Sequence, residues 1–549
     1  MLILRPSTSF LLFSVSLPAP ALAQSALDRI APAASLPAEA PEAPVPTAVR
    51  PSIEIEGPAK KAKPPVSVFA GAVTIVGMKA LIPADFADIL GRYVGRLLPG
   101  DQLAELAGSI ADRARSRGYA LATAWIEPQR VSSGVLVVRL DEGRIDELRF
   151  EGPEQAAVRR ALSPLADGNP VRIEELERRV LIAGDIDGVR VRRTRFVREG
   201  ERGILIVQVA EERTATRLVF ANDGTRPVGP EQLRFDLDVN GVLAADDALS
   251  VTYSTTPFQP EELWFGRVRY GKRVSANGTE LAFVTSGSIA HPGAYLKPFD
   301  LESRSWFVGA ELLRPMLRRR DESLWFQAEL GVRSLRQSRR DVLIRDDRLT
   351  VARATLHGYS QLAGGRIRIS STLSQGLNLF GATGPRDPMS SRFDADATFT
   401  SLSIWSDWTR TLGGPFSFRA AAQSQFASQP LLISEETGLG GTGFLRGYDW
   451  SERSGDEGVM ALAELRYLWK QPFKAIRRAQ LYAFIDGGEV DNLRSGFGSG
   501  SLASTGGGIR ADVTARFGAN FEVAVPLSGA RYDTNDRTPK LNFRLVRSF

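Results

Sequence analysis

The stretch that decides the fold is GLGGTGFLRGYDW, residues 438–450, with Leu445, Arg446, Gly447 and Tyr448 at its core. A glycine-rich run leads into an arginine, a glycine and an aromatic residue, between two segments that alternate as β-strands do. Glycine lets the backbone adopt positive φ and approach its surroundings closely, and arginine carries a permanent charge on a rigid fork of donors. Such a loop suits a confined polar space. An ordinary long hairpin loop with a surface arginine is the alternative. The segments on either side of the stretch are needed to choose between the two interpretations.

Alternation of apolar and polar residues dominates the chain from residue 214 to residue 549. It is clearest in segments 232–240, 248–254, 459–467, 509–515 and 520–525. Strands of about ten residues with an apolar outer face and a charged inner face are typical of an outer-membrane barrel. A soluble sandwich also alternates, but with its polar face outward. The length of this region allows 14, 16 or 18 antiparallel strands.

Composition narrows the classes of function. The chain has 549 residues, which indicates several domains. It has no cysteine, which excludes disulfides and thiolate metal sites. His291 and His357 are its two histidines, so we predict no catalytic residue, no metal and no cofactor. The net charge of +6 is spread along the chain, which does not favour nucleic-acid binding.

The N-terminal segment is predicted to direct export. Residues 1–23 resemble a signal peptide, with Arg5, an apolar run over 10–17 and the A-x-A cleavage pattern at 21–23. That run is too short to cross a bilayer, and no later stretch reaches the roughly 18 apolar residues that a membrane helix needs. Residues 24–65 are rich in alanine, proline and glutamate, and we expect an extended linker. The sequence therefore predicts an exported protein without a membrane helix.

Two successive α+β modules are predicted over residues 66–144 and 145–213. In the first, we expect one strand over 66–78, a helix over 82–98 and an amphipathic helix over 101–117, followed by two strands. The second repeats the β-α-α-β-β order, so the two form an internal repeat.

Short motifs in the first module resemble those of a known family. They are Gly118-Tyr119, Pro128-Gln129 and Glu142-Gly143. The module resembles the first POTRA domain of two-partner-secretion transporters, the haemolysin and filamentous-haemagglutinin secretion proteins. The family pattern is P-x-Q, whereas Pro128 and Gln129 are adjacent here.

The resemblance continues through the C-terminal half. Residues 445–448 resemble the R-G-Y/F motif of the sixth extracellular loop, with Leu445 where valine is more usual. The F-x-D-x-G wall motif is matched by Phe484, Asp486, Gly487 and Gly488. The resemblance implies that the loop folds back into a barrel of 16 strands and that Arg446 meets Asp486 there as an ion pair.

The resemblance covers roughly residues 66–549. It implies an outer-membrane pore of a Gram-negative bacterium, embedded in outer-membrane lipid, with both POTRA domains in the periplasm. Such a pore captures an unfolded haemolysin- or adhesin-type exoprotein by its N-terminal secretion domain, and an open POTRA sheet edge could accept an added strand. The C-terminal Phe549 is expected to be read by the barrel-assembly machinery.

Three other classes of function remain open from the sequence. A barrel-assembly factor of the same superfamily is the nearest, but such relatives usually carry a different or larger POTRA set. A passive porin would need no POTRA domain. A barrel lipase would need a serine–histidine pairing, and the sequence offers no persuasive one.

Overall fold

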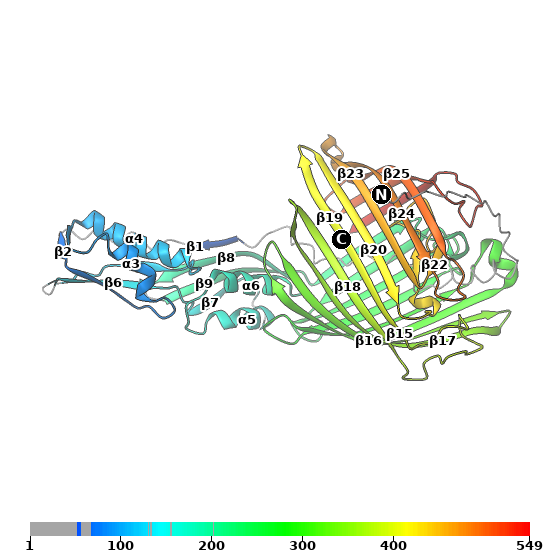
Figure 1. Ribbon diagram of the computed structural model, residues 1–549, viewed down its shortest axis with the longest axis horizontal. Coiled ribbons are helices and arrows are strands. Elements are labelled where there is room, and N and C mark those ends of the chain that lie inside the picture. Colours follow the sequence, from blue (N-terminus) through cyan, green and yellow to red (C-terminus); the bar gives the residue numbers. More distant parts are fainter. Residues whose placement is uncertain (1–51, 56–66, 130, 132–133, 154–155, 201) are drawn as a thin grey trace, which may run out of the picture.

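The computed structural model describes residues 52–55, 67–129, 131, 134–153, 156–200 and 202–549. The signal peptide predicted over 1–23 and most of the linker predicted over 24–65 lie outside these residues. Figure 1 shows two α+β modules that project as an arm from one end of a β-barrel. Among the described helices, none combines the length and the apolar character needed to cross a membrane.

The first module combines two helices with a two-stranded and a three-stranded sheet. Its elements are β2 (Val68–Ala70), β3 (Ala72–Val76), η1 (Pro83–Phe86), α3 (Ala87–Leu90), β4 (Arg96–Leu98), α4 (Gly100–Ser116), β5 (Thr123–Trp125) and β6 (Val135–Asp141). The strand orders are β2-β4 and β3-β6-β5. Helix α4 buries Leu103, Leu106 and Ile110 against these sheets, as its apolar spacing predicts.

Two details of the first module differ from the sequence prediction. The strand expected over 66–78 is divided into β2 and β3 at Gly71. The helix expected over 82–98 ends at Leu90, and turns follow up to Gly95, whose φ of +77° reverses the chain into the next strand. The last part of the expected helix is β4, which pairs with β2 in antiparallel fashion.

The second module has the predicted β-α-α-β-β order. Its elements are β7 (Glu147–Glu151), α5 (Ala156–Leu162), η2 (Ser163–Leu165), α6 (Ile173–Gly184), β8 (Val189–Glu199) and β9 (Arg202–Glu211). A further strand, β1 (Ser52–Ile55), comes from the segment predicted as an extended linker and pairs with β8 in parallel. The sheet order is therefore β1-β8-β9-β7.

A closed antiparallel barrel of 16 strands follows, which confirms the predicted fold class and strand number. The strands are β10 (Thr214–Ala221), β11 (Gln232–Asn240), β12 (Asp247–Thr255), β13 (Trp264–Arg273), β14 (Glu280–Ala290), β15 (Leu301–Arg318), β16 (Ser323–Arg339), β17 (Val342–Leu362), β18 (Gly365–Leu377), β19 (Thr400–Gly413), β20 (Phe416–Ala427), β23 (Glu457–Phe473), β24 (Ile476–Asp491), β25 (Gly500–Asp512), β26 (Phe517–Pro526) and β27 (Lys540–Ser548). The seam between β10 and β27 closes the barrel, with Phe220 opposite Leu545.

Alternation along these strands sorts the side chains between the two faces of the wall. In β23, Leu465 is 47% exposed while its neighbour Glu464 is fully buried. In β26, Phe521 and Val523 are exposed while Glu522 between them is buried. The apolar residues point outward and the acidic residues inward, as expected for a barrel in lipid.

Connections at the end of the barrel away from the modules include four long loops. They are L5 (378–399), L6 (428–456), L7 (492–499) and L8 (527–539). L6 carries the sequence motif and a small hairpin of β21 (Thr437–Leu439) and β22 (Arg453–Gly455).

Ion pairs join the second module to the opposite end of the barrel. Arg318 at the end of β15 donates two hydrogen bonds of 2.7 Å to Asp185, which follows α6. Arg160 of α5 lies 2.6 Å from Asp246, in the turn between β11 and β12. These contacts fix the arm at the mouth of the barrel that lies away from L6.

Candidate functional site

The tip of L6 (residues 444–448) lies folded into the barrel. Leu445 and Tyr448 have no exposed surface, and Arg446 is 4% exposed. Leu445 and Tyr448 pack in one apolar cluster with wall residues of β23, β24 and β25, among them Leu462 and Phe484. The motif of residues 445–448 is therefore an interior contact and not a surface hairpin.

Arg446 reaches three carboxylates on the inner wall. Its Nη1 donates to Glu522 Oε2 of β26 over 2.8 Å, and its Nη2 donates to Glu464 Oε2 of β23 over 2.8 Å. The Nε lies 3.6 Å from Asp486 Oδ2 of β24. One guanidinium thus connects three strands of the wall to the tip of L6.

Asp486 mainly holds the backbone of the tip. Its carboxylate accepts a hydrogen bond of 3.2 Å from the backbone N–H of Arg446 and another from the Ser504 hydroxyl. The Ser504 hydroxyl in turn accepts a bond of 3.1 Å from the backbone N–H of Gly447. Arg446 and Asp486 are neighbours, as the motif predicts, but both Nη groups are directed to Glu464 and Glu522.

Charges at this site balance. Arg446, Arg466 and Arg510 face Glu464, Glu522 and Asp486. Glu464 is shared by all three arginines, since Arg466 and Arg510 lie 2.6 and 2.8 Å from it. A buried charge is costly unless it is paired. Without L6, the wall would hold three carboxylates against two arginines, and Arg446 supplies the third cation.

Aromatic rings of β24 cover the guanidinium of Arg446. Its central carbon lies 3.7 Å from the ring centre of Phe484 and 5.7 Å from that of Tyr482. A cation over an aromatic face is attracted by the ring electrons, more strongly where water is excluded. Phe484 of the wall motif therefore contacts the same guanidinium that the carboxylates bind.

Glycines of the two motifs allow the loop to approach the wall. A Cβ on Gly447 would lie 2.8 Å from the Ser504 Cβ, and one on Gly488 would lie 2.8 Å from the Met460 Cβ. Gly487 has ordinary space around it. Leu445 takes a φ of +58°, a strained value for a side-chain-bearing residue, and its full burial holds it there.

Tyr448 ties the tip to L8. Its hydroxyl lies 3.1 Å from both the Ser528 hydroxyl and the Gly529 carbonyl oxygen. Lys540 at the start of β27 donates to the Tyr448 carbonyl and pairs with Asp449 at 2.7 Å. L6 therefore also contacts the strand that closes the barrel.

The motif residues of the first module hold its turns together. Glu142, which is 2% exposed, accepts hydrogen bonds from the backbone N–H groups of residues 79–81. Gly143 has a φ of +90°, and a Cβ there would lie 2.5 Å from the Leu121 Cβ. Gln129 bonds both the N–H and the carbonyl of Val137 in β6.

The remaining motif residues lie near the joint between the modules. Gly118, with a φ of +96°, accepts a hydrogen bond from the N–H of Ile173 in α6 through its carbonyl. Tyr119 is buried in the core of the first module. Pro128 is exposed on a loop. Gly118 therefore links the two modules, and Tyr119 supports the core of the first.

Phe549 lies beyond the end of β27 at the closing seam. Its backbone N–H donates to the Thr216 carbonyl over 3.0 Å, and the residue is 60% exposed. The structure thus leaves this residue accessible on the barrel.

Glu464, Glu522 and Ser504 are site residues that the motifs did not identify. The two glutamates lie at inward positions of strands whose alternation the sequence shows. A charged residue at such a position indicates a polar interior, but nothing in the sequence specifies that L6 would reach it. In the described part of the chain, no group of His, Asp and Glu is arranged to hold a metal ion.

Comparison with known proteins gives two family matches. Residues 200–511, more than half of the chain, match the family described as haemolysin secretion/activation protein ShlB/FhaC/HecB. Residues 71–143 match the POTRA domain of ShlB type.

Individual relatives agree with these matches. The chain is 23% identical to the heme/hemopexin transporter protein HuxB of Haemophilus influenzae over 81% of both proteins. It is 22% identical to the outer membrane transporter CdiB of Escherichia coli, over 83% of this chain and 78% of that protein. The solved structure of E. coli CdiB superposes with a TM-score of 0.69 at 19% identity, over 90% of this chain and 92% of that one.

Proposed function

The chain belongs to the haemolysin secretion/activation family and is an outer-membrane transporter of two-partner secretion, and we propose that its first POTRA domain captures the partner exoprotein as an unfolded chain. The barrel lies in the outer membrane and the two POTRA domains in the periplasm. The partner's N-terminal secretion domain is the segment that we propose for capture.

Exposed apolar side chains on the first POTRA domain support this proposal most directly. Phe69 and Leu97 lie opposite each other on the β2–β4 ribbon and are 56% and 64% exposed. Ile82 nearby in sequence is 60% exposed. An unfolded chain offers apolar side chains and unpaired backbone groups, which match such a surface beside the free edge of a sheet.

Sheet order restricts where a strand could be added. The β8 edge of the second POTRA domain is covered by β1, whereas β7 is at the outer edge of that sheet. In the first POTRA domain, β3 and β5 are the edges of the three-stranded sheet. The first domain therefore combines free edges with exposed apolar residues, which favours it as the capture site.

A photo-crosslinking amino acid placed at Phe69 or Leu97 tests the capture site. With the partner co-expressed, we expect crosslinks to its secretion domain at both positions. Glu105, which is exposed on α4 of the same domain, serves as the control position. Equal crosslinking at Glu105, or none at Phe69 and Leu97, would show that the partner is captured elsewhere.

Phe549 gives a second prediction, which concerns assembly. We propose that the exposed C-terminal ring is read by the barrel-assembly machinery, so deletion of Phe549 should lower the amount of folded barrel in the outer membrane. Heat-modifiable mobility on a gel measures this amount. Ser548→Ala, which alters the exposed last residue of β27 and keeps the Phe549 ring, should have little effect. Unchanged barrel levels after the deletion would contradict the role of Phe549.

A further inference from the structure

L6 contacts two separate regions of the barrel wall. Its tip (residues 444–448) lies on β23, β24 and β26, which are the twelfth, thirteenth and fifteenth strands in barrel order. Its first limb, here called the stem (residues 428–436), packs against β16 and β17, the seventh and eighth strands. In a closed barrel of 16 strands the seventh and fifteenth strands face each other, whereas the eighth and twelfth are a quarter turn apart, so L6 spans the interior between two separate parts of the wall.

Glu435 fixes the stem to β17. Both of its carboxylate oxygens accept hydrogen bonds of 2.7 Å from Nη2 of Arg353. Arg353 also donates to Glu329, its cross-strand neighbour on β16, over 3.0 Å. The Glu435 side chain is 8% exposed, so the pair is largely removed from water. Charge-assisted bonds of this length are among the stronger polar contacts in proteins.

Glu436, the next residue, is held by an arginine of L5. Arg392 Nη1 lies 3.2 Å from Glu436 Oε1 and 2.7 Å from Asp456 Oδ1, at the other end of L6. The same guanidinium donates to the Asn492 side chain and to the Leu493 carbonyl of L7. Arg392 therefore joins both limbs of L6 to the loops on either side of it.

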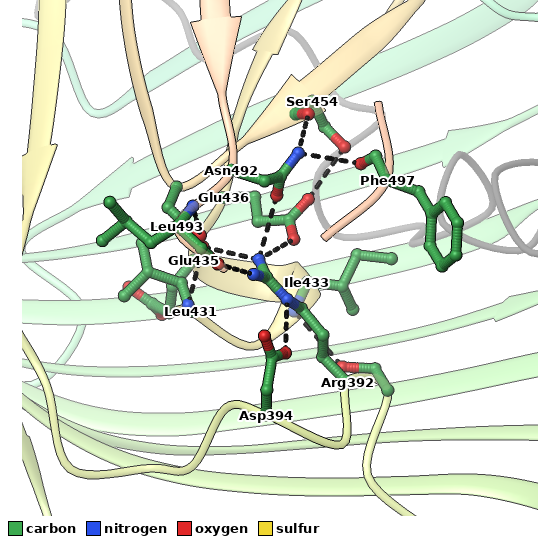
Figure 2. A network of polar contacts seen from close by, with 12 residues as sticks. Arg392, Asp394, Leu431, Ile433, Glu435, Glu436, Ser454, Asn492, Leu493 and Phe497 are labelled. Carbon is green, nitrogen blue, oxygen red and sulfur yellow. Dashed lines mark hydrogen bonds and ion pairs between the residues drawn. The ribbon is translucent and has the colours of Figure 1, made fainter. Parts of the chain in front are cut away.

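Figure 2 shows the Arg392 guanidinium enclosed by oxygens of Asp394, Glu436, Asn492 and Leu493. Burial lowers the pKa of Arg392, but the carboxylates of Asp456 and Glu436 outweigh this effect and raise it. The arginine is charged in this position, and it holds L6 closed against L5 and L7.

Apolar contacts support the same placement of the stem. Leu431 and Leu432 are fully buried in one cluster with Leu349 and Val351 of β17. Ile433 packs against Leu335 of β16. The two glutamates therefore extend from a segment whose backbone is already held against the wall.

We propose that Glu435 and Glu436, bound by Arg353 and Arg392, form a stem anchor that holds L6 across the barrel independently of the Arg446 tip, so that the pore opens only when both anchors release. A loop held at one end keeps its free end at a high effective concentration near its binding site. While one anchor is bound, it keeps the other close to its partners on the wall, so the other rebinds readily. Loss of one anchor alone therefore leaves L6 mostly in place.

Ion conductance of the full-length protein in planar bilayers tests this inference without any partner protein. The variants are Glu435→Gln/Glu436→Gln for the stem, Arg446→Gln for the tip, and the three substitutions together. We expect each anchor variant alone to raise the mean conductance slightly, and the combined variant to raise it by more than the sum of the two increases. A combined increase no greater than that sum would overturn the inference.

Glu329→Gln is the matched control, because it removes the wall partner of Arg353 and leaves the contact with L6. Combined with Arg446→Gln, it should not produce the extra conductance. When Glu435→Gln of the combined variant is replaced by the exchange Arg353→Glu/Glu435→Arg, opposite charges are restored at the anchor and the conductance should fall again. Failure of the exchange in a barrel that still shows heat-modifiable mobility would also overturn the stem anchor. Neither result bears on capture by the first POTRA domain, since no partner is present.

Discussion

Replacing Arg446 with alanine is expected to lower export of the partner protein by about tenfold or more, because removal of one member of a buried ion pair costs about 3–5 kcal/mol. The wall would then hold Glu464, Glu522 and Asp486 against the cations Arg466 and Arg510 alone. Glu522 would lose its ion pair with Arg446 in a buried position. The tip of L6 should therefore lose its fixed position on the wall, while the stem anchor and the strand hydrogen bonds of the barrel remain.

Secreted partner in the culture medium measures this effect, with heat-modifiable mobility as the check on folding. Arg446→Lys keeps the charge but offers no planar fork and no stacking surface for Phe484, so an intermediate loss is expected. Arg453→Ala changes another arginine of L6 that lies outside the tip network and bonds the Ser499 carbonyl. Equal losses for Arg446→Ala and Arg453→Ala would show a general effect on L6 and not a role of the tip.

Double-mutant cycles separate the two kinds of carboxylate contact. Arg446→Ala combined with Glu522→Gln should be strongly non-additive, since Arg446 is the cation paired with Glu522 and both changes remove that pair. Arg446→Ala combined with Asp486→Asn should be closer to additive, because Asp486 also binds the backbone N–H of residue 446 and the Ser504 hydroxyl. The reverse order of coupling would make Asp486 the main partner of the side chain, as the motif alone predicts.

The barrel could be predicted from the sequence because its rule is local. In β23 and β26, each side chain is assigned to a face by its position alone, and Glu464 and Glu522 follow the alternation that places them inward. The number of strands does not follow from this rule, because the same number of residues can form fewer strands with long loops or more strands with short loops. The resemblance to a family supplied the number 16.

The first POTRA domain shows where local rules fail. Residues 82–98 have helical spacing of apolar residues, but Leu97 and Leu98 belong to β4, which is stabilised by its pairing with β2. That pairing joins residues far apart in the sequence and depends on the reversal at Gly95. Helix propensity is a weak preference, which tertiary pairing overrides here.

Only part of the site could be predicted from the sequence. The motifs identified Arg446 and Asp486 as neighbours, and the structure places them 3.6 Å apart at Nε and Oδ2. The motifs did not identify Glu464 and Glu522 as the partners that accept the Nη hydrogen bonds. The stem contacts of Glu435 were also not predicted. L6 has 29 residues, 428 to 456, and its path depends on contacts with distant strands that the sequence does not specify.

Removal of the first POTRA domain has a defined structural cost. Leu121 is its one residue in the core of the second domain, and the other members of that core lie between Ile145 and Val209. Asp141, which pairs with Arg198 of β8, would also be lost. The second domain keeps its sheet, its helices and its ion pairs to the barrel, among them Arg318 with Asp185. We therefore expect it and the barrel to fold without the first domain.

Deletion of residues 66–143 is expected to reduce export of the partner by about a hundredfold or more, since a tethered capture site raises effective concentration and avidity by factors of this order. The barrel should still reach the outer membrane, because Phe549 and the closing seam are unchanged. Secreted partner and its periplasmic degradation products measure the effect, and ion conductance of the truncated protein checks that L6 is still in place. Matched substitutions of Phe69 and Leu97 by serine in the full chain should reproduce part of the loss. Export at the level of the unchanged protein after the deletion would mean that the partner reaches the pore without the first POTRA domain, and the capture step would then belong to the free β7 edge of the second.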